Sequence, residues 1–340
     1  MIKTSVVILN WNGLPFLKKF LGDVMKYSLD QNTEVIIADN GSTDGSAEWL
    51  SANFKDAGFI STGQNLGFAG GYNYALKQID SEYYVLLNTD IQVTEGWLSP
   101  LVRFMDENPD VASCQPKIRS YHQRDHFEYA GAAGGFIDKY GFTFCRGRIF
   151  GHVEKDFGQY DDAADIFWST GACMIVRAKA WRECKGFDED FFAHMEEVDL
   201  CWRFHNAGYR VCYLPQSFVY HVGGGSLPYE SYLKTYLNFR NNLFLIYKNL
   251  PERDLHKILP ARKNFNRLAA LLFLLKGKTS NVKAVFRAHA DFSKSLDKLR
   301  EKRKLLRHNK EKDWGKLISN KSIVFEYFLK GNRTYRPWQP

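Results

Sequence analysis

Three carboxylates stand close together in the segment EEVDLCWR at residues 196–203. Glu196 and Asp199 are three residues apart and share one face of the helix that we predict for residues 197–207, whereas Glu197 is turned away from Glu196 by about 100°. Acidic residues in the first turn of a helix commonly stabilise the helix dipole, so each of them has a structural explanation. Two adjacent carboxylates beside a substrate cleft could instead raise the pKa of one of them and supply a general base.

A second group of polar residues follows apolar stretches of the chain. Asn88 and Asp90 come after the stretch at residues 83–87, and His221 comes after the stretch at 218–220. A carboxylate at the end of a strand can hold a hard divalent cation together with substrate phosphates. The glycine run after His221, GGGS at 223–226, would let the imidazole reach the same cation, although a single histidine is more often structural. We take Asp90 and His221 as candidate ligands of Mg²⁺ or Mn²⁺.

Two turns have the composition of a nucleotide site. Asp39 opens the turn DNGSTDGS at 39–46, where its carboxylate could accept N–H groups of a base, although the same residue types dominate ordinary turns and helix caps. The glycine-rich segment NLGFAGGYN at 65–73 would allow close approach of a nucleotide sugar, or simply close packing of a helix on a strand. The turn at 10–13, which contains Asn10 and Asn12, has no G-x-G-x-x-G pattern and is therefore not a dinucleotide fingerprint.

These residues are spaced along a chain that alternates apolar stretches with helical patterns. Strands are predicted at residues 5–9, 35–38, 59–60 and 83–87, and helices at 14–27, 47–54, 68–78 and 97–108. Continuous apolar strands separated by helices indicate an α/β fold with a mostly parallel central sheet covered by helices on both faces. Such sheets bind ligands beyond the carboxyl ends of their strands. The pattern is irregular from 111 to 222, with short strands at 166–176 and 211–214, and becomes helical beyond 229.

Length and charge divide the chain into two parts. Its 340 residues, 45% hydrophobic and 25% charged, are typical of globular proteins and suggest about two domains. Residues 1–250 contain 23 basic and 30 acidic residues, whereas 251–340 contain 23 basic and 8 acidic ones, so the net charges are −7 and +15. The second part therefore favours an anionic partner. The six cysteines form no CxxC pair and no signal peptide pattern is visible, so we expect a cytoplasmic protein with reduced thiols and no zinc site.

The order and spacing of seven motifs resemble glycosyltransferase family 2, the inverting nucleotide-sugar transferases with a GT-A fold, and in particular its bacterial rhamnosyltransferase-type members. The motifs are VVILNWNG at 6–13, IADNGSTDGS at 37–46, NLGFAGGYN at 65–73, LLNTD at 86–90, GACM at 171–174, EEVDLCWR at 196–203 and HVGGGS at 221–226. The resemblance extends over residues 4–250. It implies a GT-A domain, Rossmann-like with a mostly parallel sheet, at residues 1–250, followed by a basic helical region at 251–340.

Carried over by position, the resemblance implies a role for each motif. Asp39 would accept hydrogen bonds from a pyrimidine base, Asp90 would be the metal-binding carboxylate of a DXD-like motif with His221 as second ligand, and Glu197 would be the catalytic base. Glu196 and Asp199 are the alternatives for the base. Glu197 stands where the family usually has an Asp. Asn88 replaces the first acid of a full DXD motif, so we expect the metal to be held weakly until the diphosphate arrives. The implied donor-binding residues are Asn10, Asn12, Asp39, Asn65, Gly67, Gly70, Gly71, Asn73, Asn88 and Arg203.

The implied reaction is the inverting transfer of a sugar from dTDP-L-rhamnose or a UDP-sugar to a hydroxyl of a glycan acceptor. A polyprenyl diphosphate would carry this acceptor during synthesis of a cell-envelope polysaccharide. Two alternatives stay open. A nucleotidyltransferase would usually have a G-x-G-x-R-like loop after its first strand, which is absent here, and a non-catalytic nucleotide- or carbohydrate-binding module would transfer nothing. No nucleic-acid-reading motif accompanies the basic region, so we expect no nucleic-acid partner.

The basic region also contains the apolar segment LAALLFLL at 268–275. Its eight residues are far fewer than the roughly 20 needed to span a bilayer. The Lys/Arg-rich stretch at 282–307 follows it, and we expect this stretch to bring six apolar residues near one face, namely Val282, Phe286, Phe292, Leu296, Leu299 and Leu306. Together they fit an element that lies on anionic lipid, peripheral on the inner face of the cytoplasmic membrane. The alternative is a helical appendage that packs on the catalytic domain and exposes a basic face.

Overall fold

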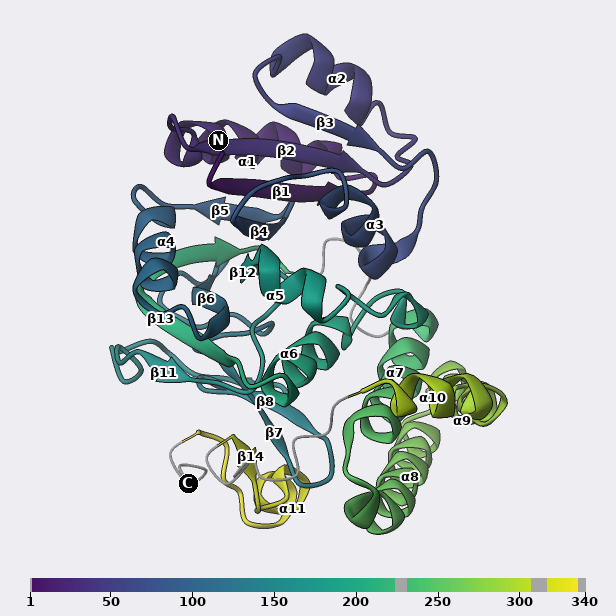
Figure 1. Ribbon diagram of the computed structural model, residues 1–340. Coiled ribbons are helices and arrows are strands. Elements are labelled where there is room, and N and C mark those ends of the chain that lie inside the picture. Colours follow the sequence, from purple (N-terminus) through teal and green to yellow (C-terminus); the bar gives the residue numbers. More distant parts are fainter. Residues whose placement is uncertain (1, 224–230, 307–316, 336–340) are drawn as a thin grey trace.

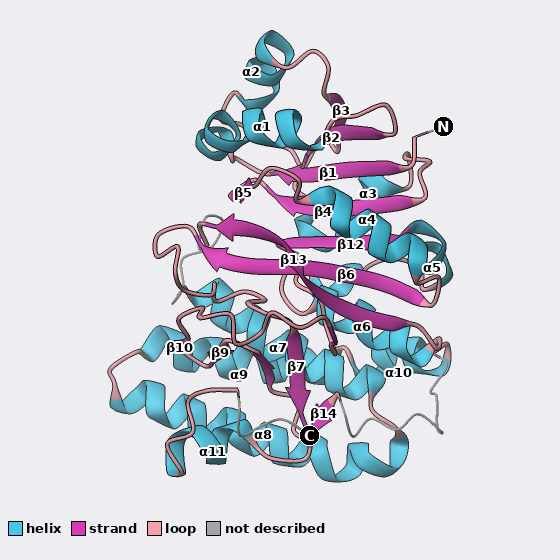
Figure 2. Cartoon of the chain, turned by 90° about the vertical axis from the view of Figure 1, so that its left-hand side faces the viewer, coloured by secondary structure: helices cyan, strands magenta, loops and turns pink. Residues whose placement is uncertain are grey.

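The computed structural model describes residues 2–223, 231–306 and 317–335. Within these residues the largest feature is a nine-stranded sheet (Figures 1 and 2). Its strands lie in the order β11 (Ala164–Asp165), β13 (Arg210–His221), β6 (Val111–Ser120), β12 (Cys173–Arg177), β4 (Tyr83–Asn88), β1 (Thr4–Asn10), β2 (Thr33–Asp39) and β3 (Gly58–Ser61). The ninth strand, β5 (Ile91–Val93), pairs with β13 outside this order.

The strands β4, β1, β2 and β3 are parallel, as the alternation of strands and helices predicts. Successive side chains of a strand point to opposite faces, so Val6 and Ile8 enter one buried cluster and Val7 enters the other. The first face is covered by α1 (Leu14–Ser28), α2 (Ser46–Asn53) and α4 (Leu98–Glu107). The second face is covered by α3 (Gly67–Leu76), α5 (Ala178–Glu183) and α6 (Glu196–Asn206). The predicted α/β fold with helices on both faces is therefore confirmed.

The region from 111 to 222 is more regular than its sequence pattern predicts. β6 and β13, of ten and twelve residues, pair in parallel through most of their length. The prediction of short strands was wrong here because Pro116 and Pro215 interrupt the apolar pattern, and the register of the pair shifts between Leu214 and Phe218. The strand predicted at 166–176 is confined to β12, which pairs antiparallel with both β4 and β6.

A second sheet and the C-terminal helices complete the fold. The second sheet has the order β10 (His152–Val153), β9 (Arg148–Ile149), β8 (Thr143–Cys145), β7 (Gly135–Asp138) and β14 (Ile318–Ser319). The helices are α7 (Tyr232–Asn249), α8 (Glu252–Leu275), α9 (Thr279–Lys294), α10 (Leu296–Lys304) and α11 (Ile323–Leu329). Figure 1 shows α7–α10 gathered at one side of the molecule. The predicted division at residue 250 falls between α7 and α8, but β14 returns to pair with β7 of the first part.

The basic stretch at 282–307 forms two helices, α9 and α10, with Ser295 between them. Phe292 and Leu299 are buried, whereas Phe286 is 60% exposed, so the prediction of one shared apolar face was wrong for Phe286. At 100° per residue, positions 286 and 292 lie on different sides of a helix. Arg307 and the glycine run from residue 224 onward fall outside the described residues. None of the helices described is long and apolar enough to cross a membrane.

Candidate active site

Asp39 lies at the carboxyl edge of the parallel strands, opposite Asn10 at the end of β1. The Asn10 amide donates to Asp39 Oδ1 at 3.0 Å, and the backbone N–H of Ser42 donates to Asp39 Oδ2 at 3.1 Å. Each carboxylate oxygen has a further lone pair, so Asp39 keeps capacity for an N–H of a ligand. Asn12 has a different role, because its Oδ1 accepts the N–H of Thr43 at 2.8 Å and fixes the turn.

Asn40, which sequence reasoning did not select, joins two of the predicted donor segments. Its Nδ2 donates to Asn65 Oδ1 at 3.1 Å and to the Gly67 carbonyl at 3.0 Å, while its Oδ1 accepts the N–H of Leu66 at 3.0 Å. Asn40 is buried, and these bonds tie the turn after β2 to the start of α3. In the sequence it looks like any asparagine of a turn, so only its neighbour Asp39 marked its position.

The glycines of the 65–73 segment are required by close packing. Gly67 has φ +74°, and a Cβ there would lie 2.4 Å from the ring of Phe192. A Cβ at Gly71 would lie 2.7 Å from Leu9 Cδ1 on β1, and one at Gly70 would lie 3.0 Å from a side chain of the preceding turn. The packing explanation therefore accounts for Gly67 and Gly71, and a direct role of these glycines in donor binding stays a prediction.

The structure does not support Asn73 as a donor-binding residue. Its Nδ2 donates to the Phe187 carbonyl at 2.9 Å and to Glu189 Oε1 at 3.0 Å, and its Oδ1 accepts the Phe187 N–H at 2.9 Å. The side chain thus holds the segment around the 3₁₀ turn η1 (Glu189–Phe191). Asn65 stays near the predicted site, where its Oδ1 also accepts the N–H of Gly67 at 2.8 Å at the start of α3.

Asp90 and His221 meet as the sequence predicts, and Glu128 joins them. His221 Nε2 lies 3.2 Å from Asp90 Oδ1, and His221 Nδ1 lies 3.0 Å from Glu128 Oε2. Burial alone would lower the pKa of His221, but the two carboxylates outweigh it and raise this pKa well above its ordinary value. Burial likewise would raise the pKa of Asp90, but the charge and hydrogen bond of His221 lower it. The backbone N–H of Glu128 donates to the Ile118 carbonyl on β6, which brings the glutamate to this place.

The separation of Asp90 and His221 fits two adjacent ligands of one cation, which would displace the proton that the raised pKa places on the His221 imidazole. Two ligand atoms about 2.1 Å from an octahedral ion are about 3.0 Å apart at a right angle, close to the 3.2 Å between Asp90 Oδ1 and His221 Nε2. Metal-bound histidines usually have a carboxylate or carbonyl at the other ring nitrogen, which Glu128 would provide. In residues 2–223, 231–306 and 317–335 no group of three or more His, Cys, Asp or Glu side chains could hold a metal ion. The other ligands of a cation bound by Asp90 and His221 would therefore be substrate phosphate and water.

Glu197 lies beside Gly171. A Cβ at Gly171 would lie 3.1 Å from the Phe68 ring and 3.9 Å from Glu197 Cβ. The next residue, Ala172, accepts the N–H of Asn88 at 2.9 Å, and Asn88 ends β4. The GACM segment therefore connects the candidate base to the edge of the sheet that also presents Asn10 and Asp39.

The two glutamates differ in exposure and in protonation. Glu196 is buried, and burial together with the charge of Glu197 raises the pKa of Glu196 well above its ordinary value. Glu197 is half-buried, and burial raises its pKa to about 7. Among the described residues, Glu196 Oε2 and Glu197 Oε2 are both buried from solvent, and neither has a hydrogen-bond partner. A carboxyl that is partly ionised at neutral pH, with a free oxygen, has the properties of a general base.

Asp199, the third carboxylate, is fully buried and saturated with donors. Arg203 Nε lies 2.8 Å from its Oδ2, Lys248 Nζ lies 2.9 Å from the same atom, and Asn249 Nδ2 lies 2.8 Å from its Oδ1. These contacts join α6 to α7. They do not support Asp199 as a base, nor Arg203 as a donor-binding residue, because Arg203 is directed to Asp199 and to the Cys184 carbonyl. Burial of this kind is not readable from the sequence.

The loop before Glu196 is strained and is held by α7. Phe192, His194 and Met195 have φ values of 62°, 70° and 73°, a region that non-glycine residues rarely adopt. Asn241 Nδ2 lies within 2.7–2.9 Å of the carbonyls of Phe191, Ala193 and His194. Such strain persists only where the surroundings over-determine the conformation, and it clusters at functional sites. Asn241 could not be predicted from the sequence, because it lies in an ordinary amphipathic helix.

Arg240 strengthens the same contact. Its Nη2 donates to the Asp190 carbonyl at 2.9 Å and to the Phe191 carbonyl at 3.1 Å. We call Arg240 and Asn241 the α7 clamp. The clamp fixes the backbone that leads into Glu196 and Glu197.

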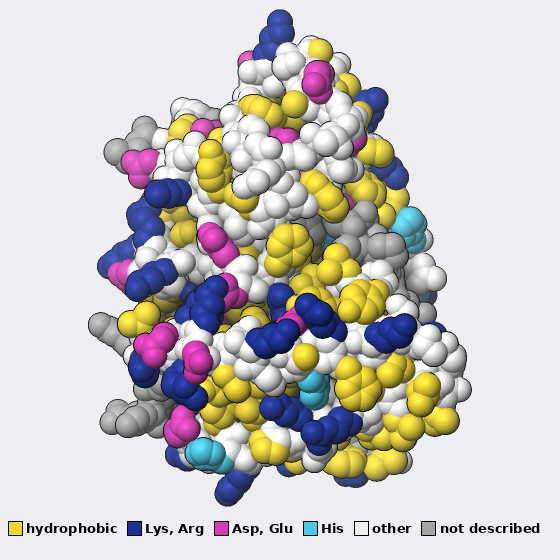
Figure 3. Space-filling view, turned by 90° about the vertical axis from the view of Figure 1, so that its right-hand side faces the viewer, with side chains coloured by type: hydrophobic (Ala, Val, Ile, Leu, Met, Phe, Trp, Pro, Cys, Tyr) yellow, Lys and Arg dark blue, Asp and Glu magenta, His cyan; other side chains and the backbone are white. Residues whose placement is uncertain are grey.

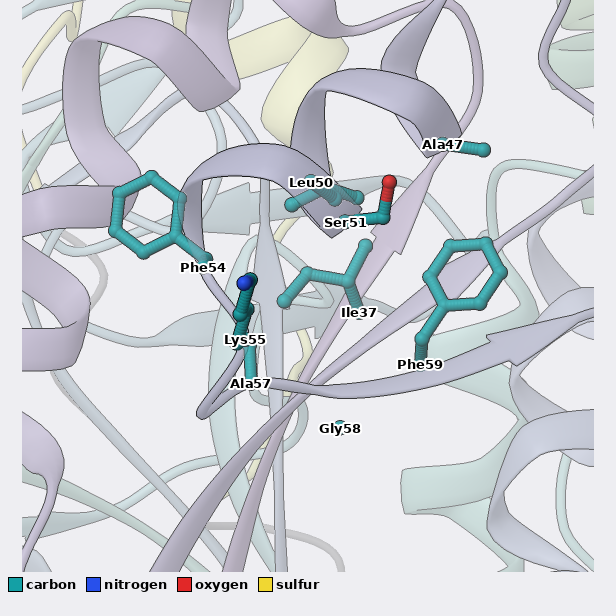
Figure 4. A pocket seen from close by; sticks show the side chains of 9 residues that line it. All are labelled: Ile37, Ala47, Leu50, Ser51, Phe54, Lys55, Ala57, Gly58 and Phe59. Carbon is teal, nitrogen blue, oxygen red and sulfur yellow. The ribbon is translucent and has the colours of Figure 1, made fainter.

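An apolar cavity of about 200 Å³ lies elsewhere, between α2 and β3 (Figure 4). Its walls include Leu50, Phe54 and Phe59, and none of its lining residues is among the predicted site residues. It is therefore no candidate for the reaction centre.

Residues 5–177 match the family described as Glycosyl transferase family 2. The chain belongs to glycosyltransferase family 2. Among the relatives of this glycosyltransferase is the N-acetylglucosaminyl-diphospho-decaprenol L-rhamnosyltransferase of Mycobacterium tuberculosis, which is 26% identical over 234 residues, 64% of this chain and 75% of the relative. The predicted family, its likeness to rhamnosyltransferases and the assignment as an enzyme are confirmed, and neither a binding module nor a nucleotidyltransferase is supported.

Solved glycosyltransferases share the fold of this family 2 chain. TarS 1–349 of S. aureus in complex with UDP-GlcNAc has a TM-score of 0.58 at 17% identity and matches 88% of this glycosyltransferase and 84% of TarS 1–349. GalNAc-T7 with UDP, GalNAc and Mn²⁺ has a TM-score of 0.58 at 15% identity, and the match covers 73% of this chain but only 48% of GalNAc-T7. At these identities the likeness shows the fold alone.

Proposed function

We propose that the enzyme transfers a sugar, with inversion, from dTDP-L-rhamnose or a UDP-sugar to a hydroxyl of a polyprenyl-diphosphate-linked glycan, with Mg²⁺ or Mn²⁺ as cofactor. The observation that carries the proposal is Glu197, a half-buried glutamate whose pKa burial raises to about 7, connected through Gly171 and Ala172 to the sheet edge. The mycobacterial relative, an L-rhamnosyltransferase named for an N-acetylglucosaminyl-diphospho-decaprenol substrate, supports rhamnose and a lipid diphosphate acceptor. The related structures with UDP-GlcNAc and with Mn²⁺ support a UDP-sugar and a divalent cation.

The reaction assigns a defined task to each side chain. Asp39 would accept an N–H of the pyrimidine base, and Asp90 and His221 would hold the cation. The cation, when bound, neutralises the charge that develops on the departing diphosphate. Glu197 takes the proton of the acceptor hydroxyl while the hydroxyl oxygen bonds to the anomeric carbon and the bond to the diphosphate breaks with its electron pair. A positioned base of this kind typically accelerates a reaction by about 10²- to 10⁴-fold.

Calorimetry tests the donor half of the proposal. Binding of UDP, dTDP, GDP and CDP would be measured with and without Mn²⁺, for the wild type and for Asp90→Asn. We expect one pyrimidine diphosphate to bind in a metal-dependent manner and the substitution to remove the dependence on metal. Failure of all four nucleotides to bind under either condition would refute the roles of Asp39, Asp90 and His221.

A transfer assay tests the catalytic half. With a short synthetic polyprenyl-diphosphate-linked N-acetylglucosamine as acceptor and dTDP-L-rhamnose or a UDP-sugar as donor, Glu197→Gln should lose about 10²-fold or more in kcat while its donor affinity stays unchanged. Glu107→Gln, at an exposed position of α4, is the matched control. Near-full activity of Glu197→Gln would move the base to Glu196.

A further inference from the structure

The C-terminal end of α8 exposes an apolar surface that no other described element covers. Its members are Leu268, Leu271, Leu272, Leu274 and Leu275, each 48–75% exposed. We call these five residues the leucine patch. Leu268, Leu271, Leu272 and Leu275 follow the helical repeat and form one stripe. Figure 3 shows hydrophobic side chains gathered at the lower right of this face, with Lys and Arg side chains above them and to their left.

The segment that contains the leucine patch is rich in positive charge. Residues 255–290 contain eight Lys or Arg and no Asp or Glu, and of these cations Arg287 pairs with Asp291 just beyond the segment. Contiguous exposed apolar side chains normally mark an interaction site, and an apolar strip with a basic surround is the composition of helices that lie in the headgroup region of anionic bilayers. A second copy of the chain would place the same positive charges against each other. We infer that the leucine patch docks on an anionic lipid surface.

The patch lies at the end of the helical region that adjoins the active site. Asn281, just after the turn between α8 and α9, donates to Thr235 Oγ1 at 3.0 Å. Thr235 is in the first turn of α7, and α7 is capped by Ser231, ten residues after His221. A bilayer that takes up the patch would therefore lie close to the start of α7. This orientation would give the enzyme direct access to an acceptor whose lipid part stays in the bilayer. Access to such an acceptor rests on the proposed function, whereas docking of the patch on lipid does not.

Vesicle flotation tests the docking without donor or acceptor. The full chain would be mixed at about 0.15 M salt with phosphatidylcholine vesicles, either pure or with about one third phosphatidylglycerol. We expect binding to the anionic vesicles, a loss of about tenfold or more in partition for the double variant Leu271→Gln/Leu275→Gln, and weaker binding at higher salt. Phe157→Gln, at a residue that is 78% exposed outside the patch, is the matched control and should bind like the wild type.

Three results would overturn the inference. They are no binding of the wild type to anionic vesicles, equal binding of the double variant and the wild type, and a wild-type dimer in sedimentation that the double variant dissociates. Because the double variant leaves the site residues intact, its transfer to a short water-soluble acceptor should equal that of the wild type. A failure of docking is thus distinguishable from a failure of the proposed transfer reaction.

Discussion

Replacing Asn241 with leucine should slow sugar transfer much more than it weakens donor binding. The Asn241 amide nitrogen contacts the carbonyls of Phe191, Ala193 and His194, and Asn241 is fully buried. Leucine fills a similar volume but donates no hydrogen bond. The loop would then lose the contact that holds its left-handed residues, and Glu197 would leave its position for part of the time.

The size of the effect follows from the hydrogen bonds. An amide NH₂ group can donate two bonds, and a buried carbonyl left without a partner costs about 1–3 kcal/mol. Two lost bonds therefore disfavour the native loop by about 2–6 kcal/mol. Because about 1.4 kcal/mol corresponds to a factor of ten, the lower figure already reduces the competent fraction by up to about 30-fold.

Asn242→Leu is the matched control for this substitution. Asn242 is the next residue of α7, is also buried, and donates to the Gly141 carbonyl at 2.7 Å rather than to the loop. Both variants should lower the Tm, but only Asn241→Leu should lower kcat by tenfold or more with the Kd for the donor nucleotide unchanged. If both variants fold and their kcat values agree within about threefold, the clamp does not position the base and the reasoning is wrong.

The remaining predictions concern the carboxylates and the loop. The base must be ionised to accept a proton, and burial raises the pKa of Glu197 to about 7. We therefore expect kcat to fall about tenfold per pH unit below pH 7 and to level off above it. A kcat that is constant from pH 5 to 8 would contradict this. Asp199→Asn should lower the free energy of unfolding by about 3–5 kcal/mol in denaturant titrations, because it leaves Lys248 buried with one partner fewer, whereas a loss below about 1 kcal/mol would mean that the contact is dispensable. Gly67→Ala should lower the Tm by several degrees, because it forces a Cβ against Phe192 at φ +74°; an unchanged Tm would show that the loop can move.

The parallel half of the central sheet could be predicted from the sequence, because each of its strands is marked by a short apolar stretch. A parallel strand that is buried on both faces consists of mostly apolar residues, so β1, β2 and β4 appear in the sequence as continuous apolar stretches of about four to seven residues. Asp39 follows from the same logic, since a polar residue directly after such a run must lie at the edge of the sheet. Strands that carry prolines and charges, such as β6 with Pro116 and Lys117, lose this signal even though they are buried.

The site residues that sequence reasoning missed depend on contacts between distant segments. Glu128 reaches His221 across 93 positions, and Asn241 reaches the carbonyl of Phe191 across 50. Neither residue has a neighbour in sequence that would distinguish it from a surface polar residue. The carboxylates of α6 show the same limit in another form. The helical repeat groups Glu196 with Asp199, but Lys248 and Asn249 of α7 occupy Asp199 with hydrogen bonds that its sequence position does not reveal.

The opposite charges of the two parts of the chain serve two separate purposes. Lys298 and Lys302 of α10 contact Asp190 at 2.5 and 2.7 Å, and Lys302 also contacts Asp188. Part of the positive charge is therefore used inside the molecule, where it holds η1 and the loop that leads to the catalytic glutamates. The segment at 255–290 contains no acidic residue of its own, and of its eight cations Arg287 pairs with Asp291. Charge reversal in α10 should therefore reduce catalysis, whereas charge reversal at Lys276 and Lys283 should reduce only vesicle binding, and the two assays separate the two roles.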